Sequence, residues 1–334
     1  MIEVIHTGAL STVQDMGRLG CLRWGVGTAG AMDRLALAAG NILLGNDEDC
    51  AAIELQVFPV RLRFLSDCDL ALTGADGDAR LDGLALLPWS AHRARAGQEL
   101  QLGLPRLGQA RTSRSYLCLP GGVDVPAVLG SRSTQMRGAF GGLEGRPLRN
   151  GDRLHVAASA PARLTRFNGL VPPEQAMPLR VDGLRALRVL PAAEYEKYTA
   201  ESRAAFWRNP WKITMQSDRY GYRLAGDEPL QPVSALEMRS HGIVPGVIQV
   251  PPDGQPIVQM RDGQPTGGYP KLGTVIEADL WRLGQAPIGE RVRFVETDWQ
   301  GALDALEETR TWLQEVRRQV ALYATLDGGQ EVRA

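Results

Sequence analysis

Residues 289–294, Gly-Glu-Arg-Val-Arg-Phe, carry the pattern that decides the fold class of this chain. A glycine begins a turn, and the apolar residues that follow alternate with polar ones, as they do in a half-buried β-strand. The same unit occurs at residues 97–102 (GQELQL) and 151–156 (GDRLHV), and residues 57–64 (VFPVRLRF) alternate in the same way. Many short strands with closely spaced turns are typical of barrels and sandwiches. The sequence therefore predicts a mainly β protein with a few helices.

The units at residues 151–156 and 289–294 are expected to close two successive β-rich domains. We place the first domain at residues 1–160 and the second at residues 185–298. Residues 161–184, in which prolines are frequent, form the connection between them. A chain of 334 residues is long enough to build both.

Two segments break the β pattern and predict helices. Residues 31–44 place apolar side chains on one face, and Gly45 follows as a natural helix-ending residue. Residues 299–323 carry an apolar stripe, and Thr297 with Gln300 fits a capping box at its start. This terminal helix either packs on the second domain or docks a partner.

The composition is that of an ordinary globular protein, with 44% hydrophobic and 22% charged residues and a formal net charge of −1. Because no basic run stands out, we expect no nucleic acid partner. The N-terminus lacks the features of a signal peptide and no long apolar span is present, so we expect a cytoplasmic protein without membrane association. The cysteines are widely spaced, which favours reduced thiols over a metal site; they are Cys21, Cys50, Cys68 and Cys118.

One nucleotide-binding motif is present but lacks its context. Residues 25–30 (GVGTAG) match the glycine pattern of a dinucleotide-binding turn and precede a predicted helix. No buried strand precedes them, and Asp33 places a carboxylate where a pyrophosphate would lie. We therefore reject a dinucleotide site. The sequence also lacks the GxSxG, Walker A and HExxH motifs.

The candidate binding region is residues 249–271, QVPPDGQPIVQMRDGQPTGGYPK. A short apolar segment lies between two polar loops rich in glycine and proline, whose Pro-Asp-Gly and Asp-Gly-Gln-Pro sequences are turn chemistry. Polar side chains on loops held by a strand are typical of a small-molecule site. Two ordinary hairpin turns remain the alternative interpretation.

Lys271 favours the binding interpretation. The chain has 37 Lys and Arg residues, but only Lys197, Lys212 and Lys271 are lysines. Lys differs from Arg because its pKa moves readily on burial, so it can exchange a proton. Lys197 lies in a charged run that indicates a solvated helix face, whereas Lys271 follows a Gly-Gly-Tyr-Pro turn.

Several other polar clusters lie on glycine-rich loops, and each is weak evidence when taken alone. Taken in order with the two loops above, they resemble the biotin-dependent carboxyltransferase family over about residues 3 to 295. Members include 5-oxoprolinase subunits and the antagonist of a sporulation-kinase inhibitor. The clusters that carry the resemblance are QDMGR at 14–18, GAMD at 30–33, GGVDVP at 121–126, GSRST at 130–134, FGG at 140–142 and SDRYGYR at 217–223.

The resemblance implies two cyclophilin-like β-barrel domains in tandem. It also implies one subunit of an ATP-dependent 5-oxoprolinase complex, which converts 5-oxoproline to glutamate, or a related carboxyltransferase acting on a urea-like substrate. Such a chain would be inactive without two partner subunits, one of the B type and one of the A type. ATP or carboxybiotin would come from those partners, since this chain has no motif for either. The alternative is a non-catalytic module that sequesters a partner protein.

The resemblance and the residue chemistry together suggest roles for the site residues. Asp262 and Lys271 are the acid/base candidates. The guanidinium fork suits a carboxylate, so arginines are expected to bind that part of a substrate. The expected substrate-binding residues are Arg18, Arg132, Arg219, Gln249, Gln264, Tyr269, Asp15, Asp218 and Tyr222.

Two residues depart from the family pattern. His241 stands where an acidic residue is expected, and Gly263 replaces a larger residue in the second loop. His241 is either a proton carrier that titrates near neutral pH or a neutral surface change.

Overall fold

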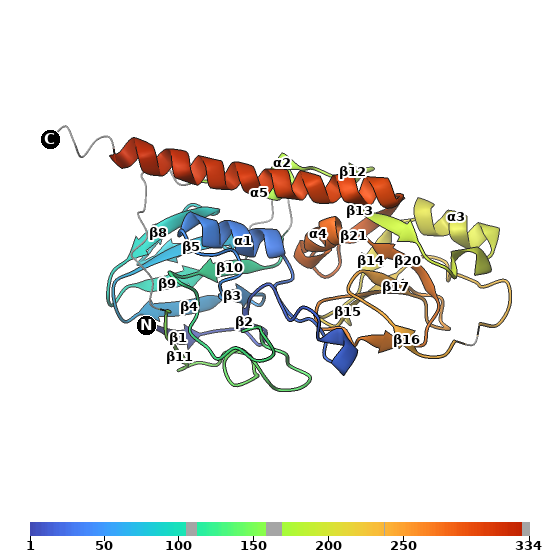
Figure 1. The fold of residues 1–334 in the computed structure, drawn as a ribbon, viewed down its shortest axis with the longest axis horizontal. Helices are drawn as coiled ribbons and strands as arrows, with labels where there is room; N and C mark the ends of the chain where they lie inside the picture. Colours follow the sequence, from blue (N-terminus) through green and yellow to red (C-terminus); the bar gives the residue numbers. More distant parts are fainter. Residues whose placement is uncertain (105–111, 158–168, 237, 329–334) are drawn as a thin grey trace. The chain divides into compact units, whose positions relative to one another are not determined.

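The computed structural model describes residues 1–104, 112–157, 169–236 and 238–328 (Figure 1). The chain divides into two compact units. The first contains Met1–Arg18, Ala29–Ala176 and Arg310–Ala334, and the second contains Leu19–Thr28 and Met177–Thr309. The chain thus passes from one unit to the other inside the predicted connection. The inclusion of Leu19–Thr28 in the second unit was not predicted.

The first unit is built on two antiparallel sheets. One has the strand order β11-β1-β4-β9-β6-β7 and the other β2-β3-β10-β5-β8. Buried side chains of both sheets, among them Val4, Leu62, Ile53 and Leu117, share one core. The strands are β1 Ile2–His6, β2 Thr12–Gln14, β3 Ala52–Leu55, β4 Val60–Phe64, β5 Cys68–Gly74, β6 Arg80–Leu81, β7 Leu84–Ala85, β8 Ser90–Ala94, β9 Glu99–Leu102, β10 Ser115–Cys118 and β11 Arg153–Leu154.

The second unit is a closed β-barrel. Its strands follow the order β13-β20-β17-β18-β15-β14-β21, and β21 pairs back with β13 in parallel, which closes a seven-stranded barrel beside the short strand β12. The strands are β12 Arg180–Val181, β13 Leu184–Pro191, β14 Trp211–Ile213, β15 Gly221–Ala225, β17 Val247–Gln249, β18 Ile257–Gln259, β20 Lys271–Val275 and β21 Arg291–Glu296, and a separate ribbon pairs β16 His241–Gly242 with β19 Thr266–Gly267. The predicted mainly β fold with barrel architecture is confirmed.

The three glycine-turn units form as predicted. Gly97, Gly151 and Gly289 have φ angles of 90°, 89° and 89°, in the left-handed region that glycine enters without steric cost. Each precedes its strand, β9, β11 or β21. Alternate residues such as Val292 and Phe294 are buried, as the pattern requires.

Both predicted helices are present, but their observed bounds differ from the predicted ones. Helix α1 spans Arg34–Leu43 because the Asp33 carboxylate accepts the Ala36 N–H at 2.9 Å, and Gly45 follows it with φ 70°. Helix α5 spans Trp299–Gly328. Its N-terminal cap is Asp298, which accepts the Gly301 N–H at 2.8 Å, so the predicted Thr297 capping box is wrong. The shorter helices are η1 Leu22–Trp24, α2 Pro173–Ala176, η2 Tyr195–Lys197, α3 Ala200–Arg208, η3 Glu277–Asp279 and α4 Leu280–Gln285.

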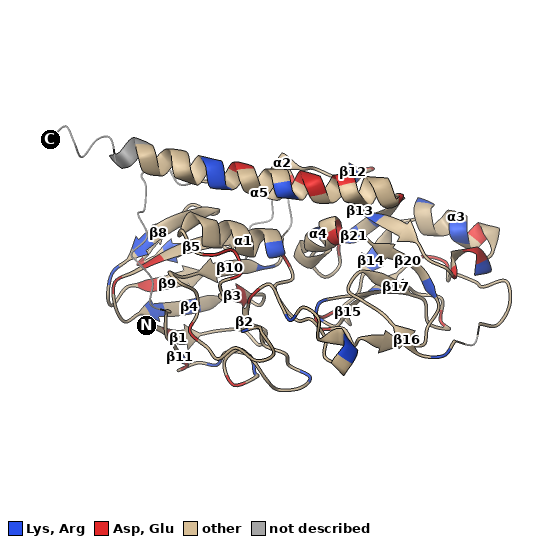
Figure 2. Ribbon diagram, in the orientation of Figure 1, with Lys and Arg blue, Asp and Glu red and all other residues tan. Residues whose placement is uncertain are grey.

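Helix α5 packs on the chain itself. In the second unit, Ala302 and Ala305 join a buried cluster with Ile276 and Ala278. Within the first unit, the rings of Trp312 and Trp89 meet edge to face at 6.2 Å. In Figure 2, positions of acidic and basic residues are coloured on the ribbon of this helix. Among the described residues, no helix is both long enough and apolar enough to cross a membrane.

Candidate functional site

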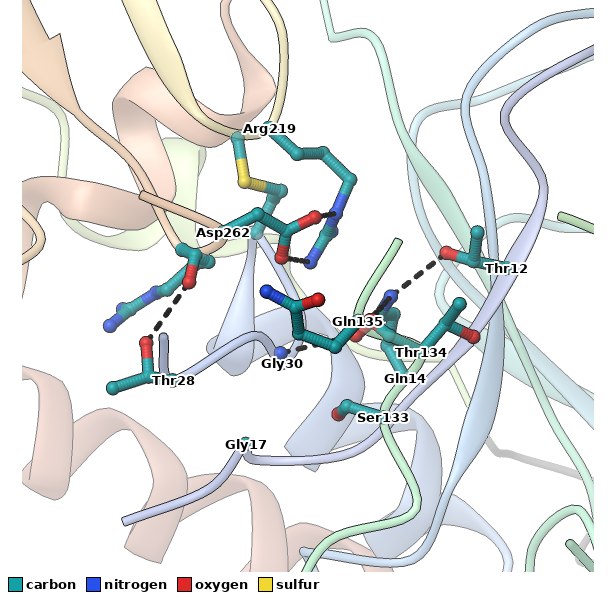
Figure 3. Close-up of polar contacts among 12 residues, drawn as sticks. Thr12, Gln14, Gly17, Thr28, Gly30, Ser133, Thr134, Gln135, Arg219 and Asp262 are labelled. Carbon is teal, nitrogen blue, oxygen red and sulfur yellow. Dashed lines mark hydrogen bonds and ion pairs between the residues drawn. The ribbon is translucent and has the colours of Figure 1, made fainter. Parts of the chain in front are cut away.

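Two buried loops of the second unit are joined by an ion pair. Arg219 donates from Nε and Nη2 to the two carboxylate oxygens of Asp262, at 3.0 and 2.9 Å (Figure 3). The side chains are 3% and 0% exposed, and the Asp262 N–H also donates to the Arg219 carbonyl at 2.9 Å. A buried bidentate pair of this kind holds its loops in one geometry. The arrangement favours a positioning role for both residues over the predicted substrate-binding and acid/base roles.

The segment Leu19–Thr28 belongs to the second unit because it packs on the same loop. The Thr28 hydroxyl donates to the Arg261 carbonyl at 3.1 Å. At Gly27, an added Cβ would lie 2.8 Å from the Gly263 carbonyl oxygen, so the backbones approach too closely for any side chain. This glycine of the GxGxxG match therefore serves backbone packing, which the sequence pattern alone could not show.

A chain of amide hydrogen bonds lies beside this loop. The Tyr269 carbonyl can only accept, so Gln249 directs Nε2 toward it at 3.4 Å and presents Oε1 to Gln259. Gln259 donates Nε2 to that oxygen at 3.0 Å. Its own Oε1 is buried and has no hydrogen-bond partner among the described residues. Gln249 was a predicted site residue, whereas Gln259 was missed. The signal that could have identified Gln259 is a polar amide at the end of an apolar strand segment.

Gly263 faces this amide chain. A Cβ at Gly263 would lie 2.5 Å from Gln259 Oε1 and 3.0 Å from the Met260 carbonyl. At this departure from the family pattern, a side chain would have to displace the Gln259 amide and press on the loop backbone.

We expect Gly263→Ala to lower the free energy of unfolding by about 1–3 kcal/mol, the usual range for overpacking. The measurement is a urea denaturation curve of the purified chain. Gly242→Ala is the matched control, because a Cβ there would meet no atom within 4 Å. Equal stability of the two variants would show that the loop yields without cost.

Lys271 begins β20 and lies opposite Gln249 in the ladder. Its backbone N–H donates to the buried Glu194 carboxylate at 3.2 Å. Its side chain is half-buried, and within the described ranges the ammonium has no ion pair. Glu194 was missed, because the charged run that contains it suggested a solvated helix face.

The other predicted residues of the second unit have different environments. Gln264 and Tyr269 are exposed on the loop that precedes Lys271, and Tyr269 is 46% exposed. The Asp218 carboxylate accepts the Tyr220 N–H at 2.8 Å and so shapes its own turn. Tyr222 is 2% exposed in the barrel wall opposite Val258. The structure thus leaves Gln264 and Tyr269 exposed on the segment that leads into β20, but places Tyr222 in the core.

His241 lies opposite Gly267 in the β16–β19 ribbon. Its Nδ1 is 2.8 Å from the Arg239 carbonyl, which can only accept, so we assign the proton to Nδ1. Nε2 is then an acceptor, and it is buried without a partner among the residues described.

In the first unit, Asp15 organises a serine-rich loop. Its carboxylate accepts from the hydroxyls of Ser131 and Ser133 at 2.7 and 2.5 Å, and from the Arg132 and Gly17 N–H groups at 2.5 and 2.8 Å. This many donors leave Asp15 little capacity to bind a substrate donor. Its position indicates that it shapes the loop.

Arg18 is fully buried in the first unit. It donates to the carbonyls of Val128 and Ser133, and its guanidinium lies 4.8 Å from the centre of the Phe140 ring. Arg132 differs, because its side chain is exposed and its Nε bonds to the Val125 carbonyl at 3.0 Å. Of these two predicted carboxylate-binding arginines, Arg132 has the accessible guanidinium.

The Gln14 side chain, shown in Figure 3, holds the glycine-rich segment before α1 through hydrogen bonds. Gln14 accepts the Gly30 N–H at 3.1 Å and donates to the Thr12 hydroxyl at 3.0 Å and the Thr134 carbonyl at 3.3 Å. Gly30 has φ 93°, and a Cβ there would lie 2.9 Å from Gly17.

The N-terminus of α1 does not fit a phosphate group. Carboxylates already occupy its donors, since Asp33 accepts the Ala36 N–H and Glu54 accepts the Met32 N–H at 2.9 Å. Tyr116 donates to Glu54 at 2.7 Å, and burial together with that carboxylate raises the pKa of Tyr116 well above its ordinary value. A phosphate would meet two buried carboxylates there, which agrees with the rejection of a dinucleotide site.

Residues 24–296 match the family model described as carboxyltransferase domain, subdomain A and B. The chain is 41% identical over 318 residues to the 5-oxoprolinase C subunit of Escherichia coli strain K12, covering 95% of this chain and 97% of that protein. It is 30% identical over 328 residues to a putative urea carboxylase of Emericella nidulans, covering 94% of this chain and 26% of that protein. The crystal structure of the K. lactis urea amidolyase superposes with a TM-score of 0.84 at 27% identity, covering 94% of this chain and 20% of that one.

Proposed function

Because the chain belongs to the carboxyltransferase domain family with subdomains A and B, we propose that it is the C-type subunit of a 5-oxoprolinase. One observation carries the proposal: similarity to the C subunit of that enzyme extends over 97% of the relative, whereas similarity to the putative urea carboxylase covers 26% of it. The chain would hydrolyse the ring amide of 5-oxoproline together with A-type and B-type subunits, in the cytoplasm. Its four cysteines are free thiols, which suits a reducing compartment.

The available side chains suit this chemistry. The Lys271 ammonium would give a proton to the ring nitrogen as the C–N bond breaks, while water adds its hydroxyl to the carbonyl carbon. The proton that this water loses would return to the Lys271 amine. Gln264 and Tyr269 would orient the amide, and the exposed Arg132 of the first unit is a separate candidate for binding a carboxylate. Buried polar residues would hold the loops that carry these groups. ATP, supplied through the partner subunits, provides the driving force. The residues with this holding role are Asp262, Arg219, Asp15 and Arg18.

The test is reconstitution. We expect the purified chain alone to show no ATP hydrolysis that depends on 5-oxoproline, and to gain it when the A-type and B-type subunits are added. The measurement is phosphate and glutamate release from each combination of subunits. The same mixtures are offered urea with a biotin carboxylase and a biotinylated carrier. Carboxylation of urea without turnover of 5-oxoproline would replace the proposal by a carboxyltransferase function.

A further inference from the structure

The outer face of the second unit's barrel carries three neighbouring cations. Lys212 on β14 lies opposite Ala225 of β15 on one side and opposite Arg291 of β21 on the other. Arg223 lies two residues before Ala225, so it points to the same face. Their sequence neighbours, such as Ile213 and Val292, are buried inside the barrel, which confirms that these cations face outward.

No acidic side chain of the described residues forms an ion pair with these cations. Lys212, Arg223 and Arg291 are exposed, and within the described part of the chain none forms an ion pair. Other arginines of this barrel differ, since Arg185 pairs with Glu290 and Arg293 with Asp182. Like charges directly opposite in a ladder destabilise a sheet, so the Lys212–Arg291 pair contributes nothing favourable to folding.

A groove of about 470 Å³ lies beside them and has an apolar rim. Met215 and Ile288 line it with Lys212, and they are 90% and 44% exposed. The Thr214 hydroxyl oxygen in its wall is buried and has no hydrogen-bond partner among the described residues. Exposed Met and Arg are enriched at protein–protein interfaces, where an apolar centre is surrounded by polar groups.

We propose that this face binds an acidic segment of a partner subunit. The segment places an apolar side chain on Met215 and Ile288, and its carboxylates pair with Lys212, Arg223 and Arg291. Charge complementarity identifies the occupant, since carboxylates complement three exposed cations that have no ion pair among the described residues. Nucleic acid fits less well, because the chain has a net charge of −1 and the rim is apolar. The proposal rests on the proposed function, which requires partner subunits.

The test compares two double variants of equal charge change. Lys212→Glu/Arg291→Glu reverses the charge of the patch. Because two like charges lie opposite each other in both the wild type and this variant, the repulsion between the two strands is unchanged. Arg95→Glu/Arg208→Glu is the control, at exposed arginines that do not line the groove. We expect the Kd for the A-type and B-type partners to rise at least tenfold for the first variant and to stay near the wild-type value for the second. Melting temperatures check the fold of both.

An unchanged Kd, or an equal loss in the control, would overturn the proposal. A single-stranded oligonucleotide that binds the wild type but not the patch variant, with unchanged affinity for the partner subunits, would assign the face to nucleic acid instead. Turnover of 5-oxoproline is measured on the same samples. Assembly that depends on the patch without turnover would refute the proposed function alone, and turnover with unchanged affinity in the patch variant would refute the inference alone.

Discussion

Lys271→Arg is expected to lower the turnover of the reconstituted complex by about 10²-fold or more, the usual scale for general acid/base catalysis. Arginine keeps the positive charge but does not release a proton in a protein, and its planar head has a different donor geometry. Lys271 is a half-buried residue whose ammonium has no ion pair in the described structure, so its proton is not committed to a carboxylate.

The matched control for this prediction is Lys197→Arg. Lys197 is exposed in η2, and the same substitution there should leave turnover at the wild-type level. Melting temperatures of both variants test whether the fold is intact. A well-folded Lys271→Arg complex with full turnover would exclude Lys271 as the proton donor.

Asp262→Asn is expected to lower the free energy of unfolding by about 3–5 kcal/mol, the range for removing one partner of a buried ion pair. The amide carries no charge and cannot accept from both Arg219 donors as the carboxylate does, so the buried ion pair is lost. The measurement is the shift of the urea midpoint of the purified chain, combined with a double-mutant cycle through Arg219→Met and Asp262→Leu.

The cycle separates a positioning role from a catalytic one. If Asp262 positions the loop, the double variant should recover much of the stability that either single change removes, because no buried charge is left unpaired. If Asp262 is instead an acid/base residue, Asp262→Asn should fold with nearly normal stability and lose turnover. The second result would return Asp262 to the catalytic role that its loop position first suggested.

The sequence predicted features that depend on local backbone chemistry. A glycine before alternating apolar residues marks β9, β11 and β21, because the φ of the turn and the inward side chains are set within a few residues. The apolar periodicity of α1 and α5 identified both helices. The cap of α5 was misassigned by one residue, because Thr297 and Asp298 are both good capping residues and only the backbone path selects between them.

The candidate site was predicted less completely, because its side chains are defined by partners far away in the sequence. Loop chemistry selected Gln249, Gln264, Tyr269 and Lys271 as candidates, and all four lie within one stretch of sequence. It did not show that Glu194 receives the Lys271 N–H, since these residues are 77 positions apart.

By itself, then, the sequence determined the β class, the two main helices and the family, because these follow from local conformational preferences and from motif order. Only the tertiary structure decided which charged residues are accessible. Arg219 and Asp262 are charged, as Lys271 is, yet they are 43 residues apart in sequence and neutralise each other in the interior. The ammonium of Lys271, in contrast, has no ion pair among the described residues. The same limit applies to Lys212 and Arg291, which become one basic surface only when β14 and β21 pair. Pairing between distant segments is a property of the folded chain, so composition and spacing do not specify it.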